Sequence, residues 1–290
     1  MHKFLRAIGF SNIEKKEFNE QIAALIERPD MMRVTRDSEG NEFAELSKLY
    51  GSDMGITVRG SFGEEDVFHM DYYFPFANAT DVSTQEAIDI EKHAEKESYA
   101  GVCDEMRLGV TLIFYLQNVA DYLSEHRGKK HVSLLNGAQL SALSVDGKVL
   151  LPIQEKVTEK QTANSNEKRS HLLAEARAGN EEAIEHLTIQ DMDTYSKLSK
   201  RIMKEDILSI VTSCFMPYGI ESDQYAILGE ILDVEKIKNK VSGEEVYSMK
   251  IECNEMIFQL TINKNDLLGE PAVGRRFKGT IWMQGTVNLS

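Results

Sequence analysis

One stretch of the sequence, residues 109–123 (GVTLIFYLQNVADYL), is more apolar than any other part of the chain. Hydrophobic residues run almost unbroken from Val110 to Leu116, and polar residues set in after Gln117. This pattern, with helical spacing beginning near Asn118, predicts a strand buried on both faces that leads into a helix. The stretch is too short to span a membrane, so we expect it to be the folding centre of a globular protein.

The composition is that of an ordinary soluble globular chain, with 42% hydrophobic and 28% charged residues among 290. The net charge of −14 argues against non-specific binding to nucleic acid or to an anionic membrane, because both need local positive charge. The three cysteines are far apart and have no CxxC spacing. We therefore expect a cytoplasmic protein with buried thiols, no disulfide framework, no metal site and no cofactor. The N-terminal sequence MHKFLRAIGF lacks the apolar run of a signal peptide, which favours the same compartment.

The N-terminal half reads as two short helices followed by strands. Strands are predicted over residues 32–36, 42–49, 54–59 and 67–76, where short β-rich runs are separated by turn residues. The last strand alternates, which places five large apolar residues on one face: Phe68, Met70, Tyr72, Phe74 and Phe76. Further along, Asn136-Gly137 and Asp146-Gly147 predict two tight hairpins that join residues 131–135, 138–145 and 148–153 into a three-stranded meander.

The rest of the chain predicts a modular layout. Residues 154–205 are polar and read as a linker with helices, whereas residues 206–216 fit either a helix or a strand. From Gln224 onward, short strands alternate with turns. The predicted fold class is α+β: an N-terminal antiparallel sheet with helices over 1–153, a helical connector over 154–205, and a small β-barrel, OB- or SH3-like, over 206–290.

One pair of residues suggests catalysis. His69 and Asp71 are two apart on a predicted strand and so share a face, where a carboxylate can orient an imidazole as a general base. The sequence places no nucleophile beside them, and a solvated sheet face is the alternative interpretation.

Two groups of side chains in the predicted barrel suggest binding. The candidate binding residues are polar or aromatic and lie in or beside turns: Tyr218, Asp223, Tyr225, Arg275, Arg276 and Trp282. Basic residues next to aromatic ones are typical of single-stranded nucleic-acid platforms. The acidic balance of the chain argues against that partner, and ordinary turn chemistry or barrel core explains the same residues.

Four stretches carry a resemblance to a known family: MHKFLRAIGFS at the start, IFYLQN at 113–118, FMPYGIESDQY at 215–225 and GEPAVGRRFKGTIWMQG at 269–285. Together they resemble a bacterial domain-of-unknown-function family, family 3881, from anaerobic Gram-positive bacteria. The resemblance covers essentially the whole chain and implies a cytoplasmic bacterial protein. It implies no activity, cofactor or site residue.

The familiar catalytic motifs are absent from the sequence, which has no Walker A loop, no GxGxxG, no HExxH and no GxSxG elbow. This favours a non-catalytic protein that binds another protein as a scaffold, using the barrel and the linker helices. One alternative is a ligand- or single-stranded nucleic-acid-binding module in the barrel. The other is an enzyme with a site near His69 and Asp71. Partner, substrate and oligomeric state stay open.

Overall fold

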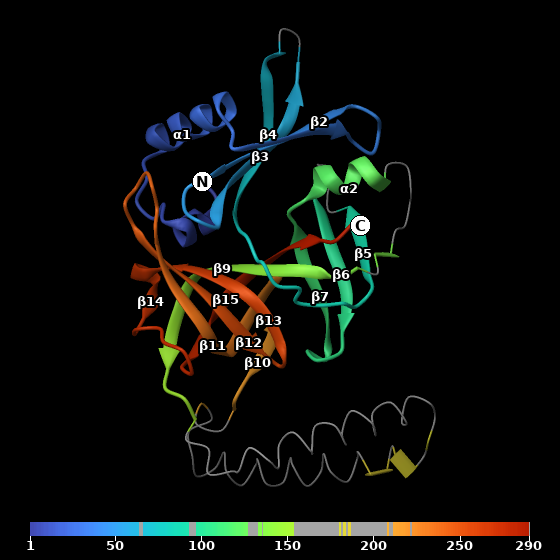
Figure 1. Cartoon of the computed structure of the whole chain (residues 1–290), viewed down its shortest axis with the longest axis vertical. Helices are drawn as coiled ribbons and strands as arrows, with labels where there is room; N and C mark the ends of the chain where they lie inside the picture. The colour runs from blue at the N-terminus through green and yellow to red at the C-terminus, as the bar shows by residue number, and fades with distance from the viewer. Residues whose placement is uncertain are drawn as a thin grey trace. The chain divides into compact units, whose positions relative to one another are not determined.

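The computed structural model describes residues 1–63, 66–92, 97–126, 133–134, 136–153, 211–220 and 222–289, together with residues 180, 182–183, 185–186 and 208. The chain separates into two compact units, Met1–Leu151 with Ser213–Ser290, and Pro152–Thr212. The first unit is mostly β-structure (Figure 1). The linker and helices predicted over 154–205 lie largely outside the described residues.

The predicted N-terminal antiparallel sheet is confirmed. Its strands pair in chain order: β1 (Met31–Arg36), β2 (Glu42–Leu49), β3 (Met54–Phe62) and β4 (Phe68–Ala77). Two helices precede it: the 3₁₀-helix η1 (Lys3–Ile8) and the α-helix α1 (Lys15–Glu27). Helix η1 ends at Gly9, whose φ of 88° is a left-handed conformation that suits glycine.

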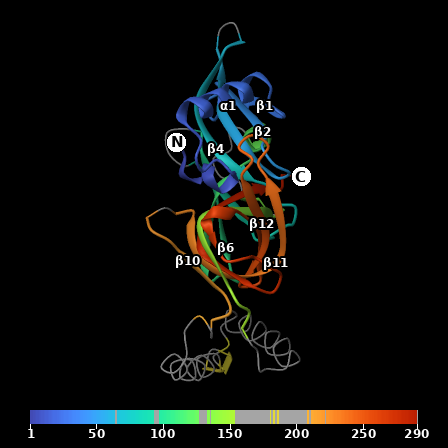
Figure 2. The same ribbon diagram turned by 90° about the vertical axis from the view of Figure 1, so that its left-hand side faces the viewer.

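Both faces of this sheet are covered. On one face, the ring of Tyr73 packs against Phe18 of α1, with ring centroids 4.9 Å apart (Figure 2 shows α1 beside the sheet). On the other face, Phe74 packs against Tyr115 of strand β7 (Val110–Leu116), with centroids 4.8 Å apart. Because neighbouring residues of a strand point to opposite faces, the sheet lies between α1 and the second sheet.

A β-bulge interrupts the aromatic row predicted on β4. Arg59 of β3 faces Tyr72, but the next residue, Gly60, faces Met70, so Asp71 is the extra residue of the bulge. The first two members of the predicted row therefore lie on the opposite face from the last three. The prediction of one continuous aromatic face is wrong, because one inserted residue reverses the alternation.

Replacing Gly60 with alanine is expected to destabilise the protein by about 1–3 kcal/mol, the usual cost of overpacking. A Cβ at this position would lie 2.0 Å from the carbonyl oxygen of His69, a backbone atom held by the bulge. Urea unfolding measures the change, and Ser61→Ala on the next residue is the control, expected within about 0.5 kcal/mol of wild type. Equal stability of Gly60→Ala and wild type would mean that the bulge is absent.

The second sheet contains a closed five-stranded barrel, as predicted. Its strands are β9 (Ala138–Leu150), β11 (Gln224–Lys238), β12 (Glu245–Cys253), β13 (Met256–Asn263) and β15 (Arg276–Val287). They pair in the cycle β11–β12–β13–β9–β15, and β15 pairs back to β11. All of these pairs are antiparallel except β13 with β9. Most of the barrel strands are visible in the lower part of the ribbon in Figure 1.

The predicted meander is wrong, and its main strand belongs to the barrel. Strand β9 continues through Asp146 and Gly147, with β15 along its length and β13 on its other side. The register leaves Val145 as an extra residue opposite β15. Asp146 and Gly147 therefore follow a β-bulge and do not form a turn. A Cβ on Gly147 would lie 2.4 Å from Cε2 of Phe277, so glycine is needed here for close ring packing. The barrel therefore takes one strand from outside residues 206–290.

The remaining strands belong to the second sheet: β5 (Ile88–Lys92), β6 (Tyr99–Glu105), β8 (Ser133–Leu134), β10 (Cys214–Pro217) and β14 (Leu267–Leu268). The helices not yet named are α2 (Val119–His126) and η4 (Lys264–Asp266). Strand β7 pairs with β15 of the barrel and with β6, and β8 pairs with β5 instead of β9.

The central strand and helix predicted from the apolar stretch are confirmed as β7 and α2. Burial along β7 alternates, however, between fully buried and partly buried residues after Thr111. Of the ambiguous segment 206–216, the last residues form strand β10, which pairs with β11. Within the described part of the chain, no helix is long and apolar enough to cross a membrane.

Candidate functional site

The predicted acid–base pair lies on the exposed part of β4, near the β3–β4 turn. His69 faces Ser61 across the strands, and both His69 and Asp71 are exposed. Because Asp71 is the extra residue of the bulge, the alternation that predicted a shared face does not hold there. The His69 ring lies so close to Gly63 that a Cβ on this glycine would be 2.6 Å from Nε2. A catalytic role for the pair stays a prediction.

The predicted loop residues lie in different surroundings. Tyr218 is 50% exposed, whereas Tyr225 is only 1% exposed. The Tyr225 hydroxyl donates to the carbonyl oxygen of Ile113 at 3.0 Å and accepts from its N–H at 2.8 Å. Burial raises the pKa of Tyr225 to about 12. Tyr225 thus ties β11 to β7 and is closed to solvent, whereas Tyr218 is open to it.

The structure brings Asp223 and Trp282 together. The indole Nε1 donates to Oδ2 of Asp223 at 2.7 Å, and the ring stacks on Phe4 with centroids 5.2 Å apart. Trp282 is only 6% exposed. Its indole therefore secures the N-terminal helix η1 against the barrel and presents no open stacking face for a base.

The two arginines of the predicted platform lie apart from the tryptophan. Arg276 is 7% exposed and donates through Nε and Nη2 to the carbonyl oxygen of Leu151, at 3.1 Å each. Burial lowers the pKa of Arg276. Arg275 donates to the carbonyl oxygen of Glu270 at 2.7 Å. Six residues of extended strand, roughly 20 Å, separate Arg276 from Trp282, so these three side chains do not form one surface.

A buried arginine that sequence reasoning missed joins the two sheets. Arg59 is 0% exposed and uses all five of its N–H donors. Its acceptors are Oε2 of Glu45 at 2.7 Å, the hydroxyls of Tyr72 and Tyr115 at 3.0 Å each, and the carbonyl oxygens of Leu116 at 3.1 Å and Gln117 at 2.7 Å. Its guanidinium carbon also lies 4.6 Å from the centre of the Phe74 ring. No donor is left for a ligand, so this cluster is a structural junction.

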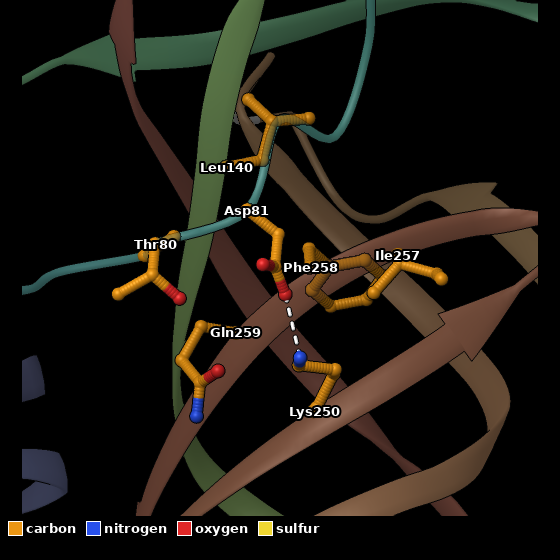
Figure 3. Close-up of a pocket in the computed structure, with 8 residues that line it drawn as sticks. Thr80, Asp81, Leu140, Lys250, Ile257, Phe258 and Gln259 are labelled. Carbon is orange, nitrogen blue, oxygen red and sulfur yellow. Dashed lines mark ion pairs between the residues drawn. The ribbon is translucent and has the colours of Figure 1, made fainter.

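Two hollows are present among the described residues. One, of about 10 Å³, lies between Thr80, Leu140 and the strands β12 and β13, and an ion pair of 2.6 Å between Asp81 and Lys250 crosses it (Figure 3). It has room for roughly one water molecule. The other, of about 240 Å³, is lined by Glu86, Ala87, Asp89, Val102, Cys103 and Asp104. Burial, reinforced by nearby carboxylates, raises the pKa of Cys103 to about 12, so its thiol is protonated at neutral pH and a poor nucleophile.

The strongest candidate site is the strand β1, which we call the β1 edge. It pairs with β2 and, among the described strands, with no other. Its three large apolar side chains are about half exposed: Met31 51%, Met32 51% and Val34 49%. Met32 and Val34 lie on one face of the strand and Met31 on the other. Apolar side chains along a strand whose second side has no described partner are the usual template for pairing with another chain.

A second exposed apolar group lies at the end of β10 and on the turn that leads to β11. Met216, Tyr218 and Ile220 are exposed by 54%, 50% and 103%. Of the residues predicted as binding residues, only Tyr218 belongs to this group. Neither exposed group has a motif in the sequence. What identifies them is the exposure of their apolar side chains, which depends on how the distant parts of the chain pack.

Comparison with known proteins identifies the family and nothing more specific. No curated protein and no solved structure matches the chain. One family model, described as "Domain of unknown function, E. rectale Gene description (DUF3881)", matches residues 5–285, from within η1 to within β15. Because this match covers nearly all of the chain, as the four sequence stretches predicted, the chain belongs to the domain-of-unknown-function family DUF3881.

Proposed function

We propose that this chain is a cytoplasmic, non-catalytic binding protein that holds another protein. The observation that carries the proposal is the β1 edge, which pairs on one side only among the described strands and has three half-exposed apolar side chains. Met32 and Val34 share one face of this edge, and exposed apolar side chains that lie together on a surface mark interaction sites. The exposed turn of β10–β11 offers a second contact of the same kind.

The hydrogen bonds of the buried aromatic and arginine side chains support the same proposal. The polar atoms of four of these side chains form hydrogen bonds to other residues of the chain: Trp282, Tyr225, Arg276 and Arg59. These residues hold η1, the barrel and the two sheets together. A rigid body with its polar anchors inside and apolar side chains on a sheet edge suits a protein that presents a surface to a partner.

For the barrel itself we propose the OB-type arrangement over the SH3-like one. The meander β11–β12–β13 is closed by β15, and one parallel pair joins β13 to β9. This pairing fits an OB-type barrel in which β9, from earlier in the chain, takes the place of the final strand. Under this proposal the helical connector over 154–205 is an insertion between two barrel strands.

Native mass spectrometry of the protein purified gently from its own host tests the proposed function. We expect a second protein at a fixed stoichiometry, and the same complex should form again from the two purified components. A bound small molecule or nucleic acid, with no protein partner, would overturn the proposal. So would a candidate partner that fails to rebind after purification.

A further inference from the structure

We propose that the β1 edge binds an extended, acidic segment of a partner protein, which adds a fifth strand to the four-stranded sheet. This inference rests on the proposed function and names the surface and the chemistry of the partner. The strand offers three things that such a segment needs: free backbone groups, apolar side chains at alternate positions, and positive charge.

The backbone groups of β1 alternate between the partner strand β2 and the outside. Beyond the end of β1, the N–H of Asp37 donates to the carbonyl oxygen of Asn41 at 2.8 Å, so this pair is of the hydrogen-bonded kind. In an antiparallel ladder such pairs alternate with non-bonded ones. The register then directs the N–H and C=O groups of Met32, Val34 and Arg36 away from β2. These groups form a ready ladder for an added strand.

The side chains of the same three residues share one face. Met32 faces Leu46 and Val34 faces Ala44 on β2, and the β1 residues in between point to the other face, where Arg33 bonds Asp121 of α2 at 3.2 Å. An added strand would therefore set alternate side chains beside Met32 and Val34. No proline and no bulge protects the edge, since β1 keeps an unbroken register with β2.

The charge of the strand selects the partner. β1 contains two arginines and no acidic residue, in a chain whose net charge is −14. Arg33 is paired with Asp121, so Arg36, on the face of Met32 and Val34, is the arginine that an added strand would meet. A carboxylate opposite an arginine stabilises a strand pair, whereas two arginines opposite each other destabilise it. A second copy of this chain would set Arg33 against Arg33 when the two-fold axis passes through that residue. It would also bring together two bodies of the same strong charge. An acidic extended segment avoids the first obstacle, and a short segment carries far less charge than a second copy of the chain.

The test uses a synthetic octapeptide of alternating glutamate and valine, with capped ends and a fluorescein label, titrated with the full chain and followed by fluorescence anisotropy. We expect saturable binding, and at least fivefold weaker binding of the same peptide with lysine in place of glutamate. Val34→Pro removes one outward N–H without removing a bond to β2, and is expected to weaken binding by about tenfold, as for a lost hydrogen bond. Val34→Thr, which keeps the N–H at a half-exposed position, is the matched control and should stay within about threefold of wild type.

Two further measurements separate this inference from its alternatives. Arg36→Glu should reverse the preference, so that the lysine peptide binds more tightly than the glutamate peptide. Hydrogen exchange on the wild-type protein should show new protection at Met32, Val34 and Arg36 when the glutamate peptide is added. Absence of binding, protection elsewhere, or equal binding by Val34→Pro would overturn the inference. A partner complex that forms equally well with Val34→Pro would overturn this inference and leave the proposed function standing.

Discussion

Replacing Arg59 with methionine is expected to lower the free energy of unfolding by about 3–5 kcal/mol, the usual cost of breaking a buried ion pair from one side. The substitution leaves the Glu45 carboxylate buried without its partner, and two carbonyl oxygens of the β7–α2 junction lose their donor. Burial raises the pKa of Glu45, and Arg59 opposes that rise. Urea unfolding followed by circular dichroism measures the loss.

A second substitution identifies the cause of that loss. If the unpaired charge dominates, Glu45→Leu in the Arg59→Met background should restore about 1–3 kcal/mol, because an apolar pair costs little where a lone buried charge costs much. In the single variant we expect the folded-state pKa of Glu45 to lie above its unfolded value. The loss of stability caused by the buried carboxylate is then absent below the unfolded pKa, and it grows as the pH rises from the unfolded pKa through the folded one. The difference from wild type should therefore shrink as the pH falls from 7 to 4, and this trend should vanish in the double variant. Additive losses in the double variant would contradict a charged pair at the junction.

The parts of the fold that could be predicted are those determined by local pattern. The apolar run from Val110 to Leu116 has few alternatives to a central strand, and Gly9 ends η1 through its own backbone preference. Strand identity in the first sheet followed from short β-rich runs between turns. In each case the deciding interactions lie within a few residues of one another, so sequence spacing is enough.

The parts that could not be predicted depend on contacts between distant segments. Asp146-Gly147 carries the signature of a tight turn, yet the strand continues through it, because β15 pairs with both residues and β14 pairs with Gly147. The glycine also makes room for Phe277. The extra residue Asp71 depends on Gly60 lying against the His69 carbonyl. A bulge changes which face every later residue of the strand occupies, and the alternation of apolar and polar residues in the sequence does not reveal it.

The candidate sites show the same division. Trp282 beside basic residues reads as a binding platform, but its indole is bonded to Asp223 and packed on Phe4. Aromatic and charged residues are chosen both for binding surfaces and for anchoring, and only burial distinguishes the two uses. The β1 edge carries no motif at all. It becomes a candidate because its neighbours leave it uncovered.

Phe114 is expected to contribute most among single apolar side chains, and Phe114→Ala should cost about 3–5 kcal/mol. The ring is 0% exposed, on the strand that links the barrel to β6. The ring packs closely against two glycines: a Cβ on Gly101 would lie 2.2 Å from Cζ of the ring, and a Cβ on Gly285 would lie 2.7 Å from Cδ2. Removing the ring would leave a cavity between three strands whose backbones are paired and have little freedom to close it.

A double-mutant cycle shows whether the glycine and the ring are matched to each other. Gly101→Ala alone is expected to cost about 1–3 kcal/mol by overpacking, because the three nearest atoms to the added methyl all belong to Phe114. Phe114→Leu alone should cost less than Phe114→Ala. In the double variant the leucine leaves space for the methyl, so the total should fall short of the sum by about 0.5–3 kcal/mol. If the losses of unfolding free energy in the two single variants simply add in the double variant, the ring can move away from Gly101. The packing between β6, β7 and β15 would then be looser than close contact between ring and glycine requires.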